Sequence, residues 1–110
     1  MTVVNLTFNS RGELLGCCSK GHAHYASSGS DIVCAAVTVL LRTTLQVLLE
    51  SYGQSVQTDI TTRGTLAFRV AQEVQDRARL KYAGDFLRNG IKSLEIEYPQ
   101  HVRLRENIET

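Results

Sequence analysis

The sequence is poor in several residue types, and each shortage excludes a class of protein. Among its 110 residues there is no tryptophan, a single proline (Pro99) and only three cysteines. Three is an odd number and Cys17 and Cys18 are adjacent, so the cysteines do not resemble the disulfide framework of a small secreted protein. We therefore expect reduced thiols and a cytoplasmic protein.

The sequence also lacks an excess of charge of either sign. Twelve Lys and Arg residues against eleven Asp and Glu residues give a formal net charge of +1. The basic residues are spread along the chain, whereas a protein that binds nucleic acid usually has a strongly basic patch. We expect no direct contact with nucleic acid.

A signal peptide and an uninterrupted apolar run are missing too. The N-terminus has no basic region followed by an apolar stretch and a cleavage site. The longest apolar segment, residues 33–49, is interrupted by Arg42 and four other polar residues. This pattern predicts a core helix and no membrane span.

Strands and helices alternate in a pattern that predicts a single α+β domain over residues 1–110. Apolar and polar residues alternate in five segments, which predicts strands at residues 3–8, 13–22, 55–60, 65–70 and 101–106. Two longer segments have apolar residues at helical spacing, at residues 32–51 and 77–98. The predicted order is ββαββαβ, a mostly antiparallel sheet packed with two long helices. The last strand is expected at an edge of the sheet.

The limits of the two helices follow from local signals. Asp31 is a suitable N-cap for the first helix, and Gly53 is a suitable C-terminal stop. The apolar belt of this helix is broad, which predicts cover by the sheet on one side and by a second subunit on the other. In the second helix, Gly90 costs about 1 kcal/mol relative to alanine. Gly90 could end the helix before a strand at residues 94–98, but we prefer one helix with close contact to another backbone at Gly90.

Residues 21–41, "GHAHYASSGSDIVCAAVTVLL", contain the residues with the clearest chemistry. With Asp31 as N-cap, Cys34 is the third helical residue, beside unpaired amides that favour a thiolate and could serve as oxyanion donors. His22 and His24 precede it and could supply an imidazole. Thr38 lies one turn after Cys34 and could hold a hydroxyl near the reacting centre. The spacer is predicted to close over a substrate, with the candidate residues His24, Tyr25, Ser27, Ser28, Gly29 and Ser30.

Two other interpretations of these residues remain open. A cysteine in an apolar helix is more often a packing residue than a nucleophile, in which case the protein is a non-catalytic module. A zinc site is also conceivable, but the spacing of its candidate ligands lacks the usual pairs. Those candidates are Cys17 or Cys18 with His22, His24 and Cys34.

The segment resembles the signature of the ribosomal-processing cysteine protease family, Prp. The pattern is Gly-His-Ala, a loop of small residues, then Asp-x-Val-Cys-Ala-Ala and an apolar helix. The element order, the length and the C-terminal "IEYPQHVRL" are similar as well. The matching residues are Gly21, His22, Ala23, Asp31, Val33, Cys34, Ala35 and Ala36.

This resemblance implies a homodimeric, cytoplasmic endopeptidase that needs no cofactor or metal. It implies that Cys34 is the nucleophile and His22 the general base, with Asp31 as cap and orienter. The implied substrate is the N-terminal extension of the precursor of ribosomal protein L27. The sequence departs from the family at Thr38, where serine is frequent, and at His24, which could compete for the base role. The alternative is a non-catalytic dimeric module that binds a ribosomal protein or assembly factor.

Overall fold

The protein folds as a five-stranded sheet with two helices. The computed structural model describes residues 1–21, 28–60 and 65–109, and only the backbone of residues 28–31. The predicted ββαββαβ order and α+β class are confirmed. The elements are β1 (Thr2–Asn9), β2 (Leu14–Lys20), α1 (Ser28–Tyr52), the 3₁₀ turn η1 (Gly53–Ser55), β3 (Val56–Asp59), β4 (Thr65–Val70), α2 (Ala78–Glu97) and β5 (Val102–Glu109).

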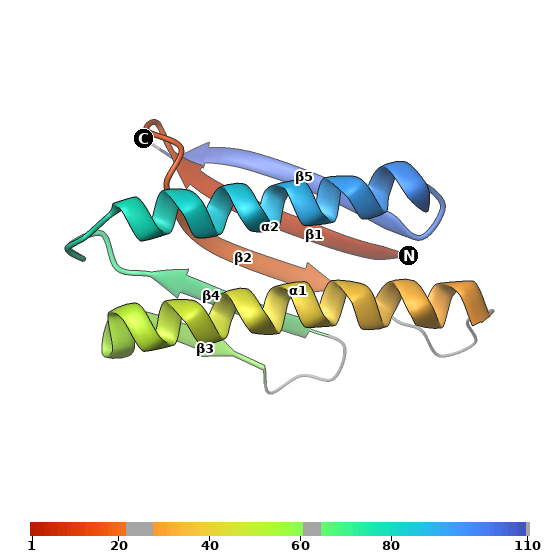
Figure 1. Cartoon of the computed structure of the whole chain (residues 1–110), viewed down its shortest axis with the longest axis horizontal. Coiled ribbons are helices and arrows are strands. Elements are labelled where there is room, and N and C mark those ends of the chain that lie inside the picture. The colour runs from red at the N-terminus through yellow and green to blue at the C-terminus, as the bar shows by residue number, and fades with distance from the viewer. Residues whose placement is uncertain (22–27, 61–64, 110) are drawn as a thin grey trace.

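The sheet has the strand order β3-β4-β2-β1-β5. Every neighbouring pair is antiparallel except β1 and β5, which run parallel. Both helices lie on one face of the sheet (Figure 1), and no described helix covers the opposite face, called the open face below. The core lies between the helices and the sheet, and Val4 and Leu6 of β1 are fully buried there.

The strand register separates the two adjacent cysteines. Leu6 pairs with Cys17, which in turn pairs with Phe68, and all three are buried. Because successive side chains of a strand point to opposite faces, Cys18 lies on the open face. The predicted hairpin turn at residues 61–64, between β3 and β4, lies outside the described residues.

Helix α1 begins earlier than the sequence predicts. Its first residue is Ser28, so Asp31 is the fourth residue of the helix and is not its N-cap. Ser28, Gly29 and Ser30, predicted in a loop, therefore belong to the helix. Aspartate is favourable both at an N-cap and in the first turn, because both positions place its charge near the positive end of the helix dipole. An aspartate at position 31 therefore did not determine which residue begins the helix. The predicted stop is confirmed, since Gly53 follows the helix with a φ of +53°.

One side of α1 packs on the sheet and the other side is exposed. The inward side consists of Val33, Val37, Leu41, Leu45 and Leu48, all buried. By length and composition the segment Ile32–Ser55 could cross a membrane, a test that core helices also pass. The buried side shows that α1 serves here as a core helix. The outward apolar residues are Ile32, Val39, Val47 and Leu49.

Helix α2 is continuous through Gly90, as predicted. The expected contact with another backbone is wrong, because a Cβ at Gly90 would meet the two methyl groups of Leu40 at 3.0 Å. Gly84 lies in a tighter position. A Cβ there would lie 2.9 Å from the Phe8 ring and 3.1 Å from Cβ of Leu14. Glycine therefore lets α2 approach both α1 and the sheet.

Strand β5 is an edge strand, as predicted, and its outer side is partly covered. The backbone amide of Leu104 donates a hydrogen bond to the Glu95 carboxylate at 2.8 Å. Arg88 pairs with Glu106 of the same strand. Such side-chain partners blunt an edge that could otherwise pair with a further strand.

The two helix glycines predict a contrast in stability. We expect Gly84→Ala to destabilise the protein by about 1–3 kcal/mol, because the added methyl overlaps the Phe8 ring and a Leu14 atom close to the backbone. Gly90→Ala should be neutral or stabilising, because the Leu40 side chain can turn away and alanine gains about 1 kcal/mol of helix propensity. Urea unfolding of the two variants measures the difference. Equal stability of both variants would contradict the packing described.

Candidate active site

The candidate nucleophile, Cys34, lies on α1 and is partly buried. Its Sγ atom is 3.6 Å from the hydroxyl oxygen of Thr2, and either group can be the donor. This distance suits a hydrogen bond to sulfur, whose radius is larger than that of oxygen. The contact joins the first residue of β1 to a helix residue 32 positions later in the chain.

Thr2 is fixed by the sheet. Its side chain is buried on the same side as Val4 and Leu6, although threonine is polar. Its backbone amide donates to the carbonyl of His101 at 2.8 Å, and it pairs in register with Val102 of β5. The hydroxyl that touches Cys34 is therefore held by two strands.

Gly21 packs against Thr2, the residue whose hydroxyl contacts the Cys34 sulfur. It follows β2 directly, and a Cβ at this position would lie 2.6 Å from the Thr2 hydroxyl oxygen and 2.8 Å from the Thr2 Cα. Real side chains do not approach a backbone atom so closely, so only glycine fits here. The glycine of the Gly-His-Ala motif thus has a steric reason in this chain, and His22 is bonded directly to it.

The structure describes only some of the other predicted site residues. His22, His24, Tyr25 and Ser27 lie outside the described residues, so the pairing of Cys34 with a histidine remains a prediction. Asp31 is described only by its backbone, in the first turns of α1. Thr38 lies one turn after Cys34 and is exposed. Thr2, which the sequence analysis missed, contacts the sulfur.

The expected position of Cys34 as the third residue of its helix is wrong. Cys34 is the seventh residue of α1 and not the third. Six residues at 1.5 Å each separate it from Ser28, about 9 Å along the helix axis. The unpaired amides and the dipole effect are confined to the first turn. The amides that open α1 therefore lie further from Cys34 than the sequence predicted.

The other two cysteines have different surroundings. Cys17 is buried in the core, and burial, with a smaller contribution from Cys18, raises the pKa of its thiol to about 12. Cys18 lies on the open face of the sheet. Within the described part of the chain, no three His, Cys, Asp or Glu side chains lie close enough together to hold a metal ion.

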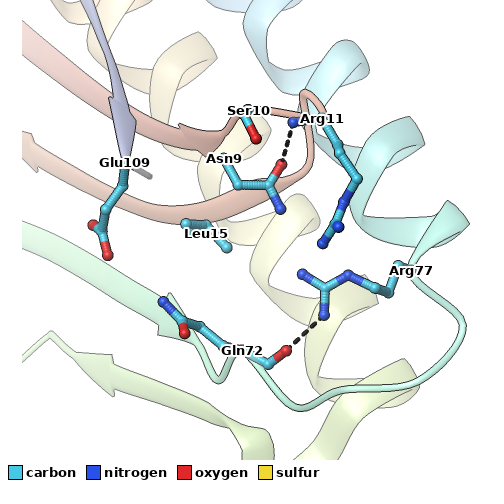
Figure 2. A pocket seen from close by; sticks show the side chains of 7 residues that line it. All are labelled: Asn9, Ser10, Arg11, Leu15, Gln72, Arg77 and Glu109. Carbon is cyan, nitrogen blue, oxygen red and sulfur yellow. Dashed lines mark hydrogen bonds between the residues drawn. The ribbon is translucent and has the colours of Figure 1, made fainter.

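A cavity of about 260 Å³ lies at the other end of β1. The residues around it include Asn9, Arg11, Gln72 and Arg77 (Figure 2). Asn9 ends β1 and Thr2 begins it, so the length of a strand, roughly 23 Å, separates the cavity from Cys34. The cavity is therefore not part of the cysteine site.

Polar groups beside this cavity form hydrogen bonds that stabilise the fold. Arg77 donates to Glu13 at 2.8 Å and to the carbonyl of Gln72 at 2.6 Å. Burial alone would raise the pKa of Glu13, but hydrogen bonds from Asn9 and Arg77 outweigh it and lower the pKa. These bonds tie the start of α2 to the β1–β2 turn.

Comparisons with known proteins agree with this fold. The family model described as "Cysteine protease Prp" matches residues 1–103. SMU.848 from Streptococcus mutans has 22% identity and a TM-score of 0.78, and the alignment covers 99% of this chain and 96% of that one. No match is found among the curated proteins.

Two structures of the ribosomal processing protease Prp from S. aureus are also similar. The complex with a substrate peptide has 22% identity and a TM-score of 0.76. The complex with a covalently linked product peptide has 25% identity and a TM-score of 0.72. Each alignment covers 97% of this chain and all of the other. Since the family model spans nearly the whole sequence, the chain belongs to the cysteine protease Prp family and is a cysteine protease.

Proposed function

We propose that the protein is a cytoplasmic ribosomal-processing endopeptidase that removes the N-terminal extension of ribosomal protein L27 and so supports ribosome assembly. Residues 1–110 act as one protease domain. Family membership supports the protease activity. The likeness to the S. aureus ribosomal processing protease, solved with a substrate peptide, supports a ribosomal protein as substrate.

The contact among Thr2, Gly21 and Cys34 is the observation that carries this proposal. It brings the end of β2, from which the chain continues into His22, to the residue whose hydroxyl touches the Cys34 sulfur. Because His22 follows Gly21 in the chain, this contact supports His22 as the base that deprotonates the thiol. The three residues come from three elements, and the fold alone unites them.

The chemistry that this arrangement supports is acyl transfer. The imidazole of His22 takes the proton of the Cys34 thiol, and the thiolate attacks the carbonyl carbon of the scissile peptide bond. The imidazolium then gives its proton to the leaving nitrogen, so the C–N bond breaks and a thioester forms. The new N-terminal amine of the processed protein departs.

Water completes the cycle. His22 takes a proton from a water molecule, whose oxygen attacks the thioester carbon. The C–S bond breaks and the thiolate and imidazolium are restored, while the extension leaves as a carboxylic acid that releases its proton to solvent and becomes a carboxylate. The steps use no metal or cofactor.

The remaining candidate residues take supporting roles in this proposal. Thr38 is exposed one turn after Cys34, so its hydroxyl is available to substrate. Asp31 contributes charge from the first turns of α1 and not as its cap. Because the backbone of residues 28–30 is helical, the segment that closes over an extended peptide is reduced to His24, Tyr25 and Ser27.

We also propose that two copies associate through their helices. The outward side of α1 exposes Ile32 and Val39, and that of α2 exposes Tyr82, Phe86 and Ile96. The two helices lie side by side (Figure 1). Apolar side chains of this size on neighbouring helices are typical of an interface. A second copy of the chain would cover them.

Cleavage of an L27 precursor tests the proposed function. Cys34→Ala should abolish cleavage, since no other group replaces the nucleophile. His22→Ala should slow it by roughly 10²–10⁴, the usual contribution of a general base. Cys18→Ala, which removes a thiol on the open face, is the matched control and should cleave normally. The cleaved product is measured by mass spectrometry.

A precursor that stays intact with the unaltered protein would contradict the proposed substrate. Cleavage by Cys34→Ala would contradict the role of Cys34. Binding of the precursor without cleavage would favour the non-catalytic module. His24→Ala, compared with His22→Ala, shows which histidine is the base.

Alkylation should distinguish the three thiols. At pH 7 a thiol with a pKa of about 12 is ionised in only about one molecule in 10⁵. We therefore expect Cys17 to resist iodoacetamide in the folded protein and Cys34 to react first. Peptide mapping after timed quenching measures both rates. Urea-unfolded protein, in which Cys17 should react readily, is the control.

The proposed dimer predicts a size and its sensitivity to charge. The protein should elute at twice the chain mass of 12.2 kDa at micromolar concentration. Val39→Glu should shift it toward the monomer, because a carboxylate would be buried at the interface. Gln57→Glu, on β3, should not. A monomeric unaltered protein in light scattering would overturn the dimer.

A further inference from the structure

We propose that Thr2 is a positioning residue of the reaction, whose hydroxyl donates a hydrogen bond to the Cys34 thiolate and fixes its direction of attack. This inference rests on the proposed role of Cys34 as nucleophile. It adds to the proposed pair a residue that is neither acid, base nor nucleophile.

The burial of Thr2 is the first argument. Its side chain is only 7% exposed, on the face of β1 where Val4, Leu6 and Phe8 are apolar. A hydroxyl buried without a partner destabilises the fold, because its lost hydrogen bonds to water are not replaced. In the described part of the chain, no buried side-chain nitrogen or oxygen lacks a partner. The Cys34 sulfur is a partner of the Thr2 hydroxyl.

The chemistry of a thiolate decides which group donates. A neutral thiol can donate or accept, but a thiolate has no proton and can only accept. When Cys34 is ionised, the Thr2 hydroxyl must therefore be the donor. Hydrogen bonds to charged groups are about twice as strong as neutral ones. The contact is thus stronger after ionisation, and it favours the reactive form.

The position of Cys34 in α1 leaves this task to another group. The amides that open the helix belong to residues about one to two turns earlier in the helix. Thr2 is also well suited to hold one direction, because β-branched side chains have few rotamers. Its backbone is held by His101 and Val102, and Gly21 packs against its hydroxyl. A shift of Thr2 would disturb the sulfur and Gly21 together.

Two pairs of variants isolate the hydroxyl. Threonine and valine have the same shape and differ by the hydroxyl, and serine and alanine differ in the same way. We expect Thr2→Val to slow alkylation of Cys34 at pH 7 by about tenfold relative to the unaltered protein, and the two rates should converge as the pH is raised. Thr2→Ala should be slower at pH 7 than Thr2→Ser by a similar factor. The kcat/KM for precursor cleavage should fall in the same order, through kcat more than KM.

The outcomes separate this inference from the proposed function. Loss of alkylation at pH 7 that serine restores and alanine does not would support Thr2 as donor. Equal alkylation profiles within both pairs would overturn it, even if Cys34→Ala shows that Cys34 is the nucleophile. Equal losses in Thr2→Ser and Thr2→Ala would assign the effect to shape and also overturn it. Circular dichroism shows which variants fold, and the serine–alanine pair decides if Thr2→Val does not.

Discussion

The start of β1 is the point on which the candidate active site depends. Thr2 is paired with β5, bonded to the carbonyl of His101, packed under Gly21 and in contact with the Cys34 sulfur. These contacts join the first strand, the end of the second, the first helix and the last strand. Because each is short and partly buried, none of these segments can move far without moving the others. The Cys34 sulfur is therefore held by a contact to the sheet.

The two ends of β1 serve different purposes. At Thr2 the contacts are few and centre on one sulfur, whereas at Asn9 a buried carboxylate, Glu13, gathers bonds from Asn9, Arg11 and Arg77. The second arrangement fixes the turn and the start of α2. The cavity beside it lies at the opposite end of β1 from Cys34.

Helix α1 has three roles. Its inward residues fill the core, and Cys34 lies at the boundary between core and solvent. Its outward apolar residues are exposed to solvent in a single copy of the chain. A partly buried sulfur can be reached by a substrate while it is held by Thr2, which a fully buried thiol such as Cys17 cannot match. Burial raises the pKa of the Cys17 thiol, which disfavours its ionisation.

The sequence by itself determined the elements, their order and the residues of the motif. The alternation of apolar and polar residues predicted β4. The helical spacing of apolar residues, with Pro99 as a stop, predicted that α2 continues through Gly90. Both signals depend only on neighbours in the chain. The start of α1 was predicted wrongly, since aspartate suits both an N-cap and a first turn. Only the tertiary structure decided that the parallel strand β5 lies beside β1, that Gly90 faces the side chain of Leu40, and that Thr2 touches Cys34. The reason is that such contacts join residues far apart in sequence, and no local periodicity records which distant side chain will meet a given sulfur.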